Sequence, residues 1–173
     1  MTRRFALALV LLAACSRSDP EPRPDPQAQP QPSASATAPT GPLVLARGVR
    51  IDKAKDGADA AKVVREARAA ERADGRDLVV YVGAKWCEPC QRFHKAAAAG
   101  QLDDAFPQLT LLEFDLDQDR DRLDAAGYHS DLIPLFVMPG DDGRASSKRF
   151  EGSVKGDGAT ANITPRLRAL LAH

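Results

Sequence analysis

The sequence predicts an α/β domain in which a central mixed sheet is flanked by helices. Short apolar runs bounded by turn residues alternate with segments of helical spacing, which is typical of parallel strands joined by crossover helices. A turn signal at Asp141-Asp-Gly143, between two short strand-like runs, adds an antiparallel hairpin near the carboxyl end. The 173 residues suffice for one such domain and not comfortably for two.

The first half of the predicted domain alternates strands and helices. Leu43–Leu45 is interpreted as a short strand or lead-in segment. Alanine and valine recur at helical spacing among charged residues from 58 to 73, which predicts a helix closed by the following Asp-Gly pair. The apolar run 77–83 predicts a buried strand, and 88–99 predicts a helix with a proline in its first turn, where proline is tolerated.

The second half continues the alternation and then adds the hairpin. Thr164-Pro165 has the composition of an N-cap followed by a first helical residue, so it is expected to open the last helix. The predicted elements are a strand at 109–116, a helix at 118–126, a strand at 135–138, its antiparallel partner at 147–152, and a final helix at 166–172.

Composition excludes one broad class of function. Lys and Arg number 24, as do Asp and Glu, so the formal net charge is zero. A nucleic-acid-binding protein usually carries a basic surplus on one face. We therefore expect no nucleic-acid partner, and we interpret the charged run 115–124 as solvated surface.

The amino terminus has the pattern of a targeting segment. Arg3 and Arg4 precede an apolar run from Phe5 to Ala14, which is the pattern of a secretory signal peptide. The run is half the roughly 20 residues that a membrane-spanning helix needs. Residues 1–14 are therefore predicted to be a signal peptide rather than a transmembrane anchor.

Leu12-Ala-Ala-Cys15 resembles the lipobox of bacterial lipoproteins. This resemblance implies that Cys15 is acylated and becomes the new amino terminus, anchoring the chain to the periplasmic side of a membrane. Ser16, in place of Asp, favours the outer membrane under the sorting rule of that family. The alternative is an ordinary cleaved signal followed by a cysteine that is there by chance.

A proline-rich linker is expected to follow. From Cys15 to Pro42 the chain is rich in Pro, Ser, Gln and Ala and holds no large apolar residue, so it cannot bury enough surface to offset its ordering entropy. Residues 15–42 are thus predicted to be a lipidated cysteine and a disordered spacer, and residues 43–173 the folded domain.

The motif Trp86-Cys-Glu-Pro-Cys90 lies between a predicted buried strand and a predicted helix. A helix amino terminus stabilises a thiolate through its unpaired N–H groups and its dipole. Cys87 is therefore expected to be the accessible thiol of low pKa. Cys90 follows by about one helical turn, so it can close a short disulfide with Cys87, and Pro89 stiffens the loop.

The segment from about residue 77 onward resembles the thioredoxin superfamily. The resemblance rests on the strand 78–82, the Trp86–Cys90 motif, Phe114-Asp-Leu-Asp117, and Ile133-Pro134 before a strand. It implies a thioredoxin-like fold, an attacking Cys87, a resolving Cys90, and a cis Pro134 that faces the sulfurs and positions substrate backbone. Within the superfamily, the chain is most similar to the periplasmic domain of DsbD-type thiol:disulfide interchange proteins.

The chain departs from this family at three positions. Tyr81 stands where many thioredoxins carry a buried Asp, so the proton acceptor of the resolving thiol is in doubt. Glu88 is expected to raise the pKa of the Cys87 thiol, an effect that Lys85 partly offsets. His94, four residues after the second cysteine, is either a proton-handling group or a partly exposed histidine without a role.

Three other uses of a Cys-x-x-Cys motif fit this sequence less well. A zinc site needs four ligands, whereas Cys87, Cys90 and His94 supply three. Haem attachment needs a histidine directly after the second cysteine, where Gln91 stands. A purely structural disulfide with so short a loop constrains the unfolded chain little. We therefore expect no metal and no cofactor.

The resulting prediction is a membrane-tethered, extracytoplasmic thiol–disulfide oxidoreductase. Cys87 and Cys90 pair while Cys15 takes the lipid, which leaves none of the three cysteines free. The expected partners are protein thiols and disulfides, together with a membrane electron donor or acceptor. The alternative from another class is a thioredoxin-fold module that binds partners without catalysis.

Overall fold

The computed structural model describes residues 47–172, so the predicted leader, Cys15, the linker and Leu43–Leu45 lie outside the described residues. Strands and helices alternate along the described chain and end in a strand hairpin and a helix. The elements are β1 (Gly48–Lys53), α1 (Ala60–Ala73), β2 (Asp77–Gly83), α2 (Glu88–Ala98), β3 (Gln108–Asp115), α3 (Leu116–Ala125), β4 (Leu135–Pro139), β5 (Ala145–Glu151) and α4 (Gly158–Leu171).

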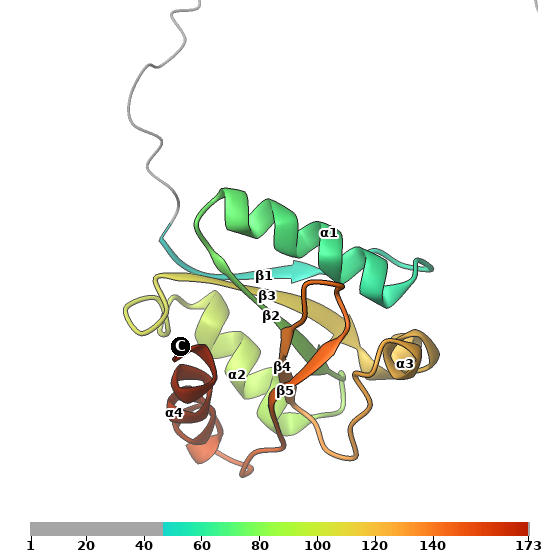
Figure 1. Ribbon diagram of the computed structural model, residues 1–173. Coiled ribbons are helices and arrows are strands. Elements are labelled where there is room, and N and C mark those ends of the chain that lie inside the picture. Colours follow the sequence, from blue (N-terminus) through green and yellow to red (C-terminus); the bar gives the residue numbers. More distant parts are fainter. Residues whose placement is uncertain (1–46, 173) are drawn as a thin grey trace, which may run out of the picture. The chain divides into compact units, whose positions relative to one another are not determined.

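The strands form one mixed sheet in the order β1-β3-β2-β4-β5 (Figure 1). β1 and β2 both run parallel to β3, whereas β4 runs antiparallel to β2 and to β5. The parallel strands are joined through helices and β4 to β5 through a tight turn, as predicted. This strand order and direction define the expected α/β class and a thioredoxin-like fold.

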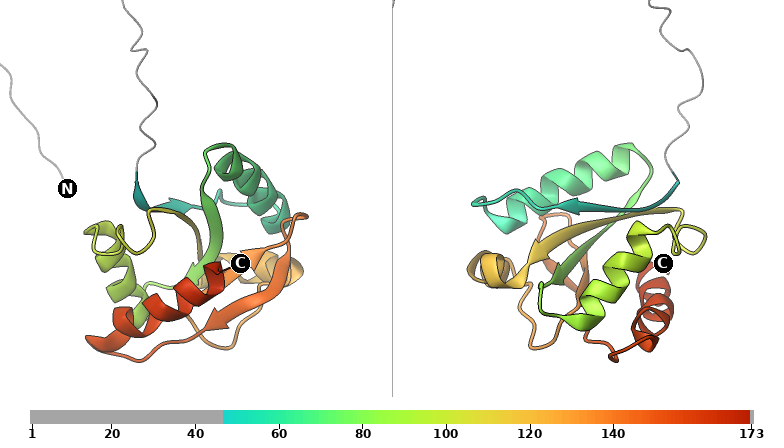
Figure 2. Two further views of the ribbon diagram at one scale, coloured as in Figure 1. Left: turned by 60° about the vertical axis from the view of Figure 1, so that its left-hand side comes forward. Right: turned by 180° about the vertical axis from the view of Figure 1, so that it is seen from behind.

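Helices cover both faces of the sheet (Figure 2). On one face α1 and α3 pack over a core that includes Val80 and Phe114, and on the other α2 and α4 pack over a core that includes Val79 and Leu111. Neighbouring residues of a strand point to opposite faces. Because both faces of β2 are covered, its sequence is an uninterrupted apolar run rather than an alternating one.

Most predicted elements are confirmed. α1, β2, α2, β3, α3, β4 and β5 begin and end within two residues of the predicted limits, which is the ordinary uncertainty of element ends. β1, by contrast, was not predicted. It alternates Val49 and Ile51 with Arg50 and Asp52, the pattern of a strand with one buried face, at the edge of the sheet.

The prediction for the last helix is wrong. α4 begins at Gly158, and Pro165 lies inside it rather than in its first turn. The buried positions Ala159, Ile163 and Leu167 form a stripe at helical spacing that continues past the proline. This buried stripe compensates for the backbone hydrogen bond that proline cannot donate.

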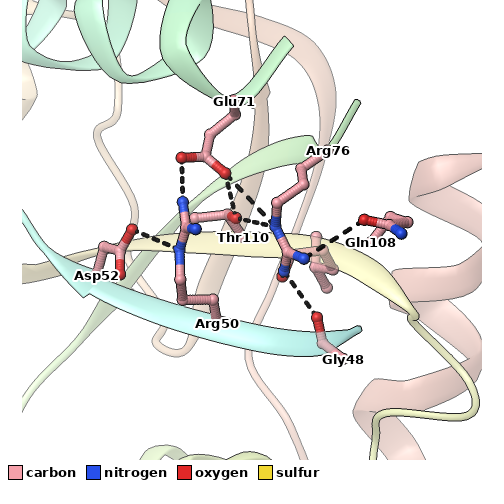
Figure 3. Close-up of polar contacts among 8 residues, drawn as sticks. Gly48, Arg50, Asp52, Glu71, Arg76, Gln108 and Thr110 are labelled. Atoms are coloured by element: carbon pink, nitrogen blue, oxygen red, sulfur yellow. Dashed lines mark hydrogen bonds and ion pairs between the residues drawn. The ribbon is translucent and has the colours of Figure 1, made fainter. Parts of the chain in front are cut away.

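A network of buried charged side chains lies at the amino ends of the parallel strands (Figure 3). The Arg76 guanidinium, 4% exposed, donates to the carbonyl oxygens of Gly48 (2.7 Å) and Leu109 (2.5 Å) and to the Thr110 hydroxyl (2.9 Å). The Thr110 hydroxyl in turn donates to the Glu71 carboxylate at 2.5 Å. One arginine thereby ties α1, β1, β2 and β3 together at this end of the sheet.

Candidate functional site

The two cysteines of the motif meet where β2 is followed by α2. Cys87 is the N-cap residue of α2, and its sulfur accepts a hydrogen bond from the N–H of Cys90 at 3.3 Å. The two sulfurs form a disulfide, and the Cα atoms are 5.2 Å apart. Pro89 lies in the first turn, where its missing N–H costs no helical hydrogen bond. In the reduced form, this geometry stabilises a thiolate at Cys87.

The exposure of the sulfurs differs from the prediction. Cys87 is 4% exposed and Cys90 is 3% exposed in the disulfide form, so Cys87 is not the markedly more accessible residue that we expected. The two cysteines differ instead in the cavities that they border. Cys87 lines a groove on one side of the disulfide, and Cys90 lines a cavity on the other.

The peptide bond between Ile133 and Pro134 is cis, as predicted. Val82 near the end of β2 is paired with Leu135 at the start of β4, so the cis bond lies at the same end of the sheet as the cysteine motif. Pro134 is buried, and Ile133 lines the groove together with Cys87. The residue before the cis proline and Cys87 therefore border the same groove.

The groove beside Cys87 is also rich in exposed apolar surface. Three large apolar side chains of the described chain are more than half exposed, namely Trp86 (64%), Leu132 (58%) and Val154 (51%). All three line this groove. A cluster of exposed apolar side chains is typical of a surface that binds a partner or ligand.

The Glu88 carboxylate is engaged by neighbouring donors. The Arg92 guanidinium donates to it from one turn further along α2, and the N–H of Gly156 donates to it at 3.1 Å. These hydrogen bonds, that from Arg92 foremost, hold the pKa of Glu88 below its usual value. Because Arg92 offsets part of the negative charge, Glu88 opposes a thiolate at Cys87 less than the sequence indicated.

The acidic run after β3 is not wholly solvated, and the prediction of a solvated surface is wrong at Asp119. The indole N–H of Trp86 donates to the exposed Asp117 at 2.9 Å, which links the cysteine motif to the first turn of α3. Asp119 is buried and accepts hydrogen bonds from the Arg122 guanidinium (2.8 Å) and from the N–H of Asp115 (2.9 Å). The run therefore caps and anchors α3.

A cavity of about 440 Å³ opens on the Cys90 side of the disulfide. Tyr81, His94 and Glu113 line it together with Cys90. Tyr81 and Glu113 are directly paired across β2 and β3, so their side chains point to the same face of the sheet, the face that α2 covers. His94 Nε2 is 3.6 Å from Glu113 Oε1, and the two side chains are 44% and 20% exposed.

Tyr81 cannot take the proton-accepting role of the Asp that many thioredoxins carry at this position. Burial first, and then the negative charge of Glu113, raise the pKa of Tyr81 far above its ordinary value, so its hydroxyl stays protonated. That hydroxyl donates a long hydrogen bond, 3.5 Å, to the carbonyl of Cys90. A Cβ at Gly83 would lie 2.9 Å from the hydroxyl oxygen, so only glycine permits this close approach.

The structure places the other predicted residues as follows. Lys85 is exposed and lines the Cys90 cavity, and His94 lies four residues after Cys90 on the same helix. The lipidation expected at Cys15 lies outside the described residues. Within residues 47–172, no group of three or more His, Cys, Asp or Glu side chains is arranged to hold a metal ion, and no helix is long and apolar enough to span a bilayer.

Sequence reasoning missed two groups that contact the predicted site. Glu113 is the neighbour of Tyr81 in the sheet, and alternation along its strand would have placed it on the same face as Leu111. Gly156, which binds Glu88, comes from a loop 68 residues away in sequence, and no local signal predicts that contact.

No family model matches the chain, and no curated protein matches it. Among solved structures, thioredoxin O1 from Arabidopsis thaliana in the oxidized state is 18% identical over 62% of this chain and 87% of that chain, with a TM-score of 0.40. A structure on the thiol resolving mechanism in yeast mitochondrial 1-Cys peroxiredoxin is 24% identical over 61% of this chain and 85% of that chain, with a TM-score of 0.39. The fold assignment rests on the strand order and directions given above.

Proposed function

We propose that this chain is a thiol–disulfide oxidoreductase that exchanges disulfides with protein substrates through Cys87 and Cys90. The observation that carries the proposal is the position of this cysteine pair. The Cys87 sulfur lies at the amino terminus of α2, bonded to Cys90, and borders a groove that contains the residue before a cis proline. A disulfide with a purely structural role requires neither the groove nor the helix terminus.

The proposed exchange has two steps. In the reduced chain the Cys87 thiolate attacks a substrate disulfide, forming a mixed disulfide and releasing one substrate sulfur as a thiolate. Cys90 then loses its proton and attacks the Cys87 sulfur, which restores the Cys87–Cys90 disulfide and releases the second substrate sulfur. Two electrons pass from the chain to the substrate, and the reverse sequence oxidises a substrate dithiol.

The groove supports polypeptides as the substrate class. Trp86, Leu132 and Val154 offer apolar contacts around the attacking sulfur, and the backbone before β4 is available to a chain in extended conformation. A small thiol such as glutathione would cover little of this apolar surface. The proposed partners are therefore proteins with accessible disulfides or thiols.

A trapping experiment tests the function. In a full-length Cys15→Ser background, reduced Cys90→Ser should accumulate mixed disulfides with a peptide that contains a disulfide bond, because the resolving thiol is gone. The matched variant Cys87→Ser should trap nothing at neutral pH, and both variants should keep the native fold by circular dichroism. Trapping by neither variant would contradict the oxidoreductase, and equal trapping by the two variants would contradict the assignment of Cys87 as the attacking thiol.

We further propose that the chain acts outside the cytoplasm, tethered to a bacterial membrane through a lipid on Cys15, with a membrane protein as its electron donor or acceptor. The lipobox-like sequence and the proline-rich segment that follows it support this location. Mass spectrometry of the mature protein should find acyl chains on Cys15, and Cys15→Ser should release the protein from membranes. A mature product that begins at another residue and carries no lipid would contradict the tether.

A further inference from the structure

The resolving step needs a group that accepts the proton of Cys90, and the family's usual carboxylate is replaced by Tyr81. Cys90 is 3% exposed in the disulfide form, and burial disfavours the thiolate that resolution requires. Tyr81 keeps its own proton and hydrogen-bonds the Cys90 carbonyl. Another group must therefore take the proton if the exchange is to run at neutral pH.

Glu113 has the position that this role requires. It is the β3 residue paired with Tyr81, and both side chains lie on the sheet face that α2 covers. Glu113 and Cys90 line the same cavity, which lies on the side of the disulfide away from the substrate groove. Its side chain is 20% exposed, so it is largely withdrawn from solvent and can still exchange a proton with it.

His94 adds a second contact to this carboxylate. It lies one helical turn after Cys90, and its Nε2 atom is 3.6 Å from Glu113 Oε1. An imidazole at this distance can orient the carboxylate within the cavity that Cys90 also lines, without taking the proton itself. The role that sequence analysis left open for His94 is then one of positioning.

We infer, on the basis of the proposed oxidoreductase function, that Glu113 accepts the proton of the Cys90 thiol during resolution and that His94 positions the Glu113 carboxylate. The proton passes from Cys90 to Glu113, and the Cys90 thiolate attacks the sulfur of Cys87 in the mixed disulfide. The Cys87–substrate bond breaks as the Cys87–Cys90 bond forms, and the substrate leaves as a thiolate. Glu113 then returns the proton to solvent through the open cavity.

Other charged groups also border this cavity. Lys53 is paired with Glu113 from β1, so it is the nearest cationic residue in the sheet. Asp56 borders the same cavity and is exposed, which makes it a matched carboxylate for a control. The titratable residues that line the cavity are Lys53, Asp56, Tyr81, Lys85, His94, Glu113, Asp115 and Asp119.

Stopped-flow reaction with dithiobis(nitrobenzoate) separates the two steps. In the full-length Cys15→Ser chain, the first thionitrobenzoate released reports attack by Cys87, and the second reports resolution by Cys90. We expect Glu113→Gln to slow the second release about tenfold or more at neutral pH, which is below the roughly 10²–10⁴-fold typical of general acid–base catalysis because solvent still accepts protons. The first release should stay unchanged.

The pH dependence distinguishes proton acceptance from a merely structural role. The deficit of Glu113→Gln should shrink above about pH 9, where a thiol with an ordinary pKa of about 8.5 ionises without help. Glu113→Asp should recover part of the rate, and His94→Gln should slow the second release less than Glu113→Gln does. Asp56→Asn should leave both releases unchanged.

Several results would overturn the assignment. Proton acceptance by Glu113 is contradicted if Glu113→Gln leaves the rate of the second release unchanged, if Asp56→Asn slows it equally, or if the slowing in Glu113→Gln does not depend on pH. The positioning role of His94 is contradicted if His94→Gln slows the second release more than Glu113→Gln does. If Glu113→Gln does not fold, Glu113→Asp and His94→Gln still carry the test. The proposed function fails separately, when Cys90→Ser traps no substrate.

Discussion

The two ends of the parallel strands bury charge in opposite ways. At the amino ends, Arg76 and Glu71 are both almost fully buried, and their hydrogen bonds are made to side chains and carbonyl groups of the fold itself (Figure 3). At the carboxyl ends, Glu113 lies in a cavity open to solvent, beside a disulfide whose other face borders a groove. The buried pair at the amino ends joins strands and a helix of the fold, whereas the carboxylate at the carboxyl ends remains accessible to solvent.

This difference agrees with the general placement of sites in α/β proteins, which is at the carboxyl ends of parallel strands. The strands diverge there into loops and helix amino termini, whose N–H groups are free to stabilise anions. At the amino ends, the buried charges of Arg76 and Glu71 are instead paired within the fold. Substitutions at the two ends should therefore affect stability and thiol chemistry separately.

Removing the carboxylate of the amino-end network should cost the most stability. Glu71→Ala withdraws the counter-charge of Arg76, whose side chain is 4% exposed, and breaking a buried pair in this way costs about 3–5 kcal/mol of unfolding free energy. Urea unfolding followed by circular dichroism measures it. The control is Glu66→Ala on the same helix, an exposed residue 3.9 Å from Lys62, for which less than about 1 kcal/mol is expected.

A double substitution sharpens this prediction. Glu71→Leu combined with Arg76→Met removes both charges and keeps apolar volume, so it should destabilise less than Glu71→Leu alone, as replaced buried ion pairs do in other proteins. The thiol chemistry of folded variants should be unchanged, because Cys87 lies at the other end of β2. A double variant less stable than the single one would show that the network acts through hydrogen bonds rather than through charge compensation.

The two buried tyrosines provide a pH-dependent comparison across the faces of the sheet. Burial, followed by Glu113 for Tyr81 and Asp142 for Tyr128, raises both pKa values above the usual 10.0. Above about pH 10 the unfolded chain releases these two protons while the folded chain keeps them. The free energy of unfolding is therefore unaffected by the tyrosines below about pH 10 and falls above it, by at most about 1.4 kcal/mol per pH unit for each tyrosine.

Substitution by phenylalanine tests that prediction. Tyr81→Phe and Tyr128→Phe should each reduce the loss of unfolding free energy between pH 9 and pH 11, measured by urea titration at each pH. Tyr128 also donates to the Gly143 carbonyl at 2.8 Å, so its substitution should lower the stability at neutral pH more than that of Tyr81, whose hydrogen bond is 3.5 Å long. An unchanged alkaline slope in both variants would contradict the assignment.

The sequence predicted the elements whose patterns are local. The run 77–83 is apolar and bounded by turn residues, and it became β2 with the same limits. The sequence failed where tertiary packing decides, as in α4, whose buried stripe carries the helix through Pro165. β1 alternates apolar and charged residues over only six positions, so no continuous apolar run marks it.

The site was predictable to a similar extent. The cysteine motif and the cis bond at Pro134 follow from a local sequence pattern and a family resemblance. Glu113 lies at the site because β3 pairs it with Tyr81 of β2. That pairing is set by the strand register of the folded sheet, which the sequence does not show directly. The Arg92 and Gly156 contacts changed the expected effect of Glu88, and the second of them depends on a distant loop.

The smallest expected effect concerns that carboxylate beside the attacking thiol. In the Cys15→Ser, Cys90→Ser background, alkylation by iodoacetamide as a function of pH reports the pKa of Cys87. Glu88→Gln should lower that pKa by less than about one unit, because Arg92 already offsets much of the negative charge.

Arg92→Gln is the counterpart and should raise the Cys87 pKa by more than Glu88→Gln lowers it. It removes a positive charge and also the donor that most strongly holds the Glu88 carboxylate. The double variant should return close to the parent value, since both charges of the pair are then gone. If Glu88→Gln instead produces the larger shift, the carboxylate acts on the thiolate directly and the ion pair does not shield it.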